Sequence, residues 1–173
     1  MAKKAKLPVA LKKDSQEVCF VKDSDLCGFL RPRIKAKTGD IIEAKSSGKI
    51  GEHNGVEFYT IGQRVPVSGT GPYYVVKKDI KKNQLIVARK DDKSLYSKEI
   101  VVKDENWISR GMPKTAKVLV RTRYRQLLAT ARIVKHESRI NLIFDKPQKS
   151  VTSGQSAVFY SSRGELLGGG IIV

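Results

Sequence analysis

The sequence predicts a mainly β protein, in which a small central β-domain is followed by a second compact β-domain. Short runs of β-branched and aromatic residues recur along the chain, and turn signals such as Asn54-Gly55 separate them. Signals for helices are confined to the first residues, before Pro32. With 173 residues, the chain has room for one or two small domains, each with a modest core.

The composition is strongly basic. Lysine and arginine number 34 against 17 acidic residues, which gives a formal charge of +17 and a pI near 10.0. Such an excess attracts polyanions, either nucleic acid or an anionic membrane surface. We expect no membrane partner and a cytoplasmic location, because no apolar run approaches the roughly 20 residues that span a bilayer and no signal-peptide core is present. No Cys or His pair has zinc-ligand spacing, so we expect no metal.

The first residues are predicted to be the end of another domain. Residues 2–6 fit the last turn of a helix that stops before Pro8, and a fragment this short has no stability of its own. A second short helix is expected over residues 23–30, with Asp23 or Ser24 as its N-cap and Pro32 beyond its end.

Residues 33–90 are predicted to form the small β-domain. Asn54-Gly55 is a two-residue hairpin signal between residues 50–53 and 56–59. A second hairpin is expected from residues 73–76 and 85–88, and residues 65–72 are rich in glycine and proline, which favours a mobile loop.

Residues 91–173 are predicted to form the second β-domain. Strands are expected in this domain near residues 100–102, 117–125, 129–134, 140–144, 157–160 and 166–173. The first domain has a further expected strand near residues 41–43. Short strands at this spacing favour a compact barrel or sandwich.

A row of three arginines is the most informative basic segment. In a strand, Arg121, Arg123 and Arg125 would share one face about 7 Å apart, while Val118, Val120, Thr122 and Tyr124 would face the other way. Three guanidinium groups in line suit RNA or DNA phosphates, since each can bind two oxygens in a fork. The alternative is a solvated strand face that discourages edge pairing.

Cys19 is the candidate nucleophile. Lys12, Lys13 and Lys22 would favour its thiolate, which is the form that attacks, although an isolated cysteine is more often a small buried hydrophobe. Cys27 is expected to pack on the inner face of its short helix.

Other conspicuous residues have structural interpretations. Residues 168–170 are all glycine, and because no helix follows them we expect close backbone packing at a barrel seam rather than a phosphate loop. His53 is expected to lie at the surface or to support a turn. Four aromatic residues are expected in or near the core, with base stacking left open: Phe58, Tyr59, Trp107 and Phe144.

Several segments, in chain order, together resemble the bacterial tRNA-specific 2-thiouridylases. They cover nearly the whole chain: residues 13–16 with 19–21, 51–55 with 58–64, 74–76 with 78–79, 106–108, 123–126, 144–147, 154–160 and 167–172. These enzymes replace the 2-oxygen of a wobble uridine with sulfur. An N-terminal ATP-binding domain adenylates the base oxygen, one cysteine carries a persulfide, and a second cysteine assists sulfur release.

The resemblance implies a role for each segment. Residues 1–32 would be a remnant of the catalytic domain's end, 33–90 a central β-domain, and 91–173 a six-stranded barrel similar to the second domain of elongation factor Tu. The implied persulfide carrier is Cys19. The implied tRNA contacts are Arg123, Tyr124 and Gln155, to which the arginine row adds Arg121 and Arg125. The implied partners are tRNA, a sulfur-donor protein (a cysteine desulfurase or a relay protein) and a separate ATP-binding domain.

The family's phosphate-binding loop and its first catalytic cysteine are absent from this sequence. We therefore expect this chain to bind no cofactor itself, with ATP held by a missing N-terminal domain, and to be inactive alone, as a gene fragment or one half of a split enzyme. The alternative is a non-enzymatic RNA-binding β-barrel module in which Cys19 is inert.

Overall fold

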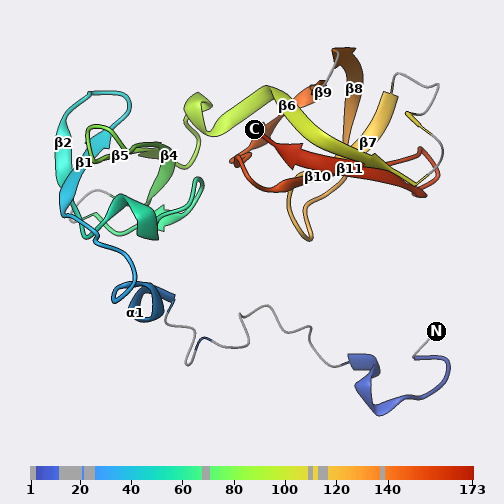
Figure 1. Cartoon of the computed structure of the whole chain (residues 1–173), viewed down its shortest axis with the longest axis horizontal. Helices are drawn as coiled ribbons and strands as arrows, with labels where there is room; N and C mark the ends of the chain where they lie inside the picture. The colour runs from blue at the N-terminus through green and yellow to red at the C-terminus, as the bar shows by residue number, and fades with distance from the viewer. Residues whose placement is uncertain are drawn as a thin grey trace. The chain divides into compact units, whose positions relative to one another are not determined.

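The computed structural model describes residues 3–11, 21, 26–67, 71–108, 111–112, 117–136 and 139–173, except for the side chains of Val9 and Leu26. The chain forms two compact units, Met1–Ala36 and Lys37–Val173 (Figure 1). The second unit contains a five-stranded sheet and a closed barrel. No helix within the described ranges is long and apolar enough to cross a membrane.

The first unit contains only short helical turns. Residues 3–6 form a turn, a 3-10 helix η1 follows at Pro8–Leu11, and α1 spans Leu26–Leu30. The predicted caps Asp23 and Ser24 lie outside the described residues. Cys27 is exposed, so the prediction that it packs inward is wrong. A five-residue helix turns little more than once, and its half-buried side carries Phe29 and Leu30 instead.

The sheet has the strand order β2-β1-β5-β4-β3. Its strands are β1 (Gly39–Glu43), β2 (Lys49–His53), β3 (Arg64–Val65), β4 (Tyr73–Asp79) and β5 (Gln84–Arg89). The predicted hairpin of β4 and β5 is confirmed, and β1 adds to β5 in parallel. Alternate residues of these strands point to one side, where seven buried residues form a core: Ile41, Val56, Val65, Tyr73, Val75, Leu85 and Val87.

The hairpin predicted at Asn54-Gly55 is wrong. Strand β2 pairs with β1, which precedes it, and the chain after Gly55 enters the 3-10 helix η3 (Val56–Phe58). Two buried contacts override the local turn signal: Val56 enters the core, and the Gly55 N–H donates to Nδ1 of His53 at 3.1 Å. His53 therefore supports a turn, as expected, but it is buried, and its Nε2 lies 3.2 Å from the Asn83 carbonyl oxygen.

The barrel closes in the order β10-β11-β6-β9-β8-β7, with every pair antiparallel. The strands are β6 (Tyr96–Trp107), β7 (Lys117–Arg121), β8 (Ala129–His136), β9 (Arg139–Lys149), β10 (Ser156–Tyr160) and β11 (Leu166–Ile172). The predicted mainly β fold with a six-stranded barrel is confirmed. Phe144 and Phe159 fill its core, and Trp107 packs at the edge, as expected for aromatic residues.

The glycines at 168–170 close the barrel seam, as predicted. They lie in β11 between β10 and β6. A Cβ on Gly170 would come within 2.7 Å of the Lys103 carbonyl oxygen, and one on Gly169 within 2.8 Å of the Ala157 carbonyl oxygen. Because both obstructions are backbone atoms of paired strands, larger residues here would force the seam apart.

Candidate nucleic-acid interface

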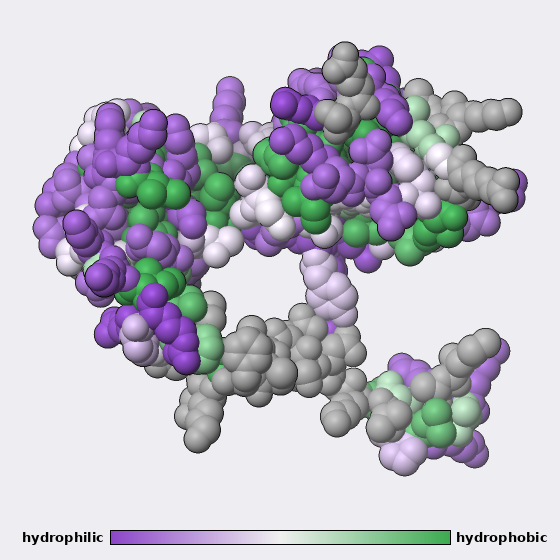
Figure 2. Space-filling view, viewed as in Figure 1, coloured by the Kyte–Doolittle hydropathy of each residue, from purple (hydrophilic) through white to green (hydrophobic). Residues whose placement is uncertain are grey.

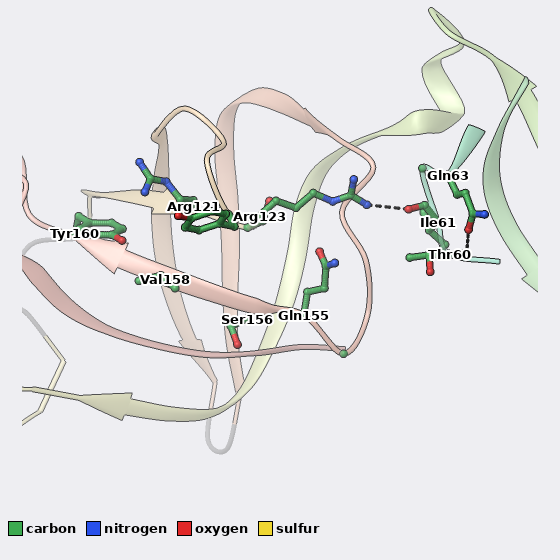
Figure 3. A pocket seen from close by; sticks show the side chains of 13 residues that line it. Thr60, Ile61, Gln63, Arg121, Arg123, Gln155, Ser156, Val158 and Tyr160 are labelled. Carbon is green, nitrogen blue, oxygen red and sulfur yellow. Dashed lines mark hydrogen bonds between the residues drawn. The ribbon is translucent and has the colours of Figure 1, made fainter. Parts of the chain in front are cut away.

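A cavity of about 870 Å³ lies within the second unit. It is lined by residues 60–63 of the sheet domain and by two barrel segments, residues 121–124 and 154–156, together with Val158 and Tyr160 (Figure 3). Strand β7 ends at the cavity and β10 begins there, which places backbone turns and long polar side chains around the opening. Hydrophilic residues cover most of the face of this unit that Figure 2 shows.

Four of the predicted RNA contacts lie in this lining: Arg121, Arg123, Tyr124 and Gln155. Arg125 is not among the lining residues, but its guanidinium stacks 5.2 Å from the centre of the Tyr124 ring. Cys19 lies outside the described residues, so its role stays a prediction.

The prediction that three arginines lie in a row on one strand face is wrong. Strand β7 ends at Arg121, and Arg125 has a left-handed backbone with φ of 61°. The strand stops because the Thr122 N–H and hydroxyl both donate to Oε1 of Gln126, at 3.2 and 2.8 Å, which replaces the strand ladder by a local turn. Val118, Val120 and Thr122 are buried, whereas Tyr124 is 65% exposed, so the predicted alternation holds only as far as Thr122.

Arg123 joins the barrel to the sheet domain. Its Nη2 donates to the Ile61 carbonyl oxygen at 2.8 Å (Figure 3). The same nitrogen donates to the Thr152 hydroxyl at 3.0 Å. The neighbouring Gly62 has a φ of 83°, and a Cβ there would lie 2.5 Å from the Ser150 Cβ. Only glycine suits both the backbone angle and the close approach. One wall of the cavity is therefore held in place by this arginine.

Three buried polar atoms in the cavity lining have no hydrogen-bond partner among the described residues: Nε of Arg121, Nε of Arg123 and Oε1 of Gln155. They are two donors and one acceptor. A buried polar group without a partner is costly, and such groups are few in natural proteins. The Arg121 guanidinium is also positioned by the Tyr160 ring, 5.7 Å from its centre. The cavity lining therefore combines two guanidinium groups and one amide whose hydrogen-bonding capacity is not fully used by the described residues.

Sequence reasoning did not assign residues 60–63 or Tyr160 to the site. Residues 58–64 belonged to a motif of the resemblance, but only the fold brings Ile61 against Arg123, 62 positions away. The one local signal was the glycine at position 62, because glycine often marks a turn or a close approach of the backbone.

Replacing Arg123 by alanine is expected to lower the free energy of unfolding by about 1.5–3 kcal/mol, the range for hydrogen bonds to a charged group. Both Nη2 hydrogen bonds would be lost, and the Ile61 carbonyl would be left without this donor. Urea denaturation measures the change. The exposed Arg125→Ala is the matched control, and an equal loss in the two variants would contradict the bridging role of Arg123.

Comparisons with known proteins agree with this architecture. The family model described as a tRNA methyl transferase PRC-barrel domain matches residues 27–89, and an aminomethyltransferase beta-barrel domain matches residues 97–172. A tRNA-specific 2-thiouridylase of Pseudoalteromonas translucida is 41% identical over 93% of this chain and 46% of its own length. Those of Mycoplasma capricolum and Neisseria meningitidis are 40% and 38% identical, over 89% and 99% of this chain and 44% and 48% of their own lengths.

The two matched domains, a PRC-barrel domain followed by a beta-barrel domain, together cover most of the chain. The chain belongs to the family of tRNA-specific 2-thiouridylases and corresponds to their C-terminal portion. It spans about half the length of the curated relatives it matches.

Proposed function

We propose that this chain is the tRNA-binding and sulfur-carrying portion of a tRNA 2-thiouridylase, and that the cavity is its main RNA contact. The observation that carries the RNA contact is the convergence of Arg121, Arg123, Tyr124 and Gln155 on one cavity that contains three buried polar atoms without partners. The formal charge of +17 supports a polyanionic ligand.

The groups in the cavity suit an unpaired nucleotide. Guanidinium N–H groups donate to phosphate or base oxygens, and the Gln155 carbonyl accepts from a base N–H. Tyr124 and Tyr160 offer aromatic rings, on which unstacked bases of single-stranded RNA commonly pack. A loop or bulge of tRNA presents such nucleotides, whereas a continuous duplex hides its base edges.

In this proposal Cys19 carries the sulfur as a persulfide. Neighbouring lysines favour the thiolate needed to accept sulfur from a donor protein. In this proposal, an N-terminal domain outside this sequence activates the uridine with ATP and supplies the family's first catalytic cysteine. The partners are therefore tRNA, a sulfur-donor protein and that ATP-binding domain.

The variant Gln155→Leu tests the RNA contact. We expect the dissociation constant for an unmodified tRNA transcript to rise about tenfold, near the upper end of the net value of one hydrogen bond. The salt dependence of binding should not change, because no charge is removed. The free energy of unfolding should stay the same or rise by up to about 1–3 kcal/mol, because an acceptor without a protein partner is replaced by an apolar group.

Gln84→Leu is the matched control, since Gln84 lies at the start of β5 and does not line the cavity. Binding measured by filter retention and stability measured by urea denaturation give the two readouts. Unchanged tRNA affinity in Gln155→Leu, together with unchanged affinity in Arg121→Ala, would remove the cavity from RNA binding.

A further inference from the structure

The loop between β7 and β8 exposes apolar side chains beside the cavity. Leu127 is 88% exposed, more than any other large hydrophobic residue in the described part of the chain, and Tyr124 is 65% exposed. Leu128, the next residue, is 37% exposed. Single exposed leucines are common on protein surfaces, so exposure alone assigns no role.

The side chain of Gln126 anchors the loop between β7 and β8. The Gln126 amide accepts from Thr122 through Oε1 and donates to Oε1 of Gln148 at 3.1 Å through Nε2. The Gln126 backbone N–H donates to the Arg123 carbonyl oxygen at 3.2 Å. The oxygen and the nitrogen of this one amide thus connect the loop to its own first residue, Thr122, and to β9. Leu127 directly follows Gln126, so these hydrogen bonds fix the position of its backbone.

The same loop forms part of the cavity wall. Thr122, Arg123 and Tyr124 line the cavity, and Leu127 follows within the same anchored turn. Leu127 is therefore three residues from Tyr124, a residue of the cavity lining that is itself 65% exposed. The formal charge of +17 favours RNA over a protein as the partner of this surface, because RNA is a polyanion.

We propose that Leu127 packs against the face of an unstacked nucleobase next to the nucleotide held in the cavity, and we call this residue the apolar lip. This inference rests on the proposed RNA contact and deepens it. Apolar side chains such as leucine are inserted beside unstacked bases by other nucleic-acid-binding proteins. Gln126 is a positioning residue, because it acts on the RNA only through the loop that it anchors.

The test compares Leu127→Ala with Ile80→Ala in the full chain, using an unmodified tRNA transcript. Ile80 is 72% exposed in the turn between β4 and β5 and does not line the cavity, which makes it a matched aliphatic control. We expect Leu127→Ala to raise the dissociation constant about fivefold, below the effect of losing one base stacked on an aromatic ring. The slope of affinity against salt should stay the same, since no phosphate contact is lost.

A second variant and a second readout separate the lip from the cavity. Leu127→Phe offers a larger apolar face and should keep or tighten binding. A 2-aminopurine base in an anticodon stem–loop should lose part of its fluorescence change on binding when Leu127 is alanine. Unchanged affinity in Leu127→Ala, or an equal loss of affinity in Ile80→Ala, would contradict the contact between Leu127 and a base. The RNA contact of the cavity would still be tested separately by Gln155→Leu. If Gln155→Leu, Arg121→Ala and Leu127→Ala all bind normally, the proposed RNA contact itself fails.

Discussion

Sulfur transfer to tRNA is expected to fall by about three orders of magnitude or more when Cys19 is replaced by serine, the scale seen when a nucleophile is removed. A persulfide needs a thiolate to accept the sulfur atom, and a serine hydroxyl cannot take this role. The assay supplies an ATP-binding domain of a relative in trans, with a sulfur donor, ATP and a tRNA transcript, and measures the thiolated product.

The matched control for this prediction is Cys27→Ser. Cys27 is exposed on a five-residue helix, so its replacement should leave both folding and sulfur transfer unchanged. tRNA binding should be the same in both variants, because the contacts that we propose lie in the cavity. Undiminished thiolation by the Cys19→Ser variant would contradict the proposal that Cys19 carries the persulfide. A Cys19 thiol that reacts with a labelling reagent only after denaturation would favour a non-enzymatic RNA-binding module.

Replacing Phe159 by alanine is expected to lower the free energy of unfolding by about 3–5 kcal/mol, the range for a fully buried phenylalanine. Phe159 is completely buried in β10, and its ring centre lies 5.2 Å from that of Trp107. Alanine would leave a cavity in the barrel core, because paired strands on both sides of β10 cannot close around it. The midpoint of urea unfolding measures the loss.

This loss should also weaken RNA binding. Strand β10 carries Val158 and Tyr160 to the cavity on the residues that flank Phe159, so a loosened strand displaces the lining. Phe58→Ala is the control, since Phe58 is only half-buried in η3 of the sheet domain and should cost clearly less. A Phe159→Ala midpoint as high as that of Phe58→Ala would show that the barrel core does not depend on this ring.

Local patterns predicted the regular parts of the fold. The β4–β5 hairpin and the barrel strands follow from alternating apolar residues and from short turns, which are properties of neighbouring residues. The glycines at 168–170 were placed at a seam because glycine within a strand signals close backbone approach. In contrast, the hairpin at Asn54-Gly55 failed because burial of Val56 and His53 outweighs the preference of one dipeptide.

The sequence alone predicts a basic, mainly β chain of two small domains, together with the residues that we propose contact RNA. Charge, alternation and glycine spacing are local, and they can be seen without the fold. The fold determines which groups surround Arg121, Arg123 and Gln155. The Gln126 side chain ends β7, and Arg123 reaches a carbonyl 62 positions away. Three buried polar atoms of cavity-lining residues have no partner among the described residues. Such contacts depend on which segments, distant in the sequence, lie side by side. Burial of the apolar residues of the two cores determines this arrangement.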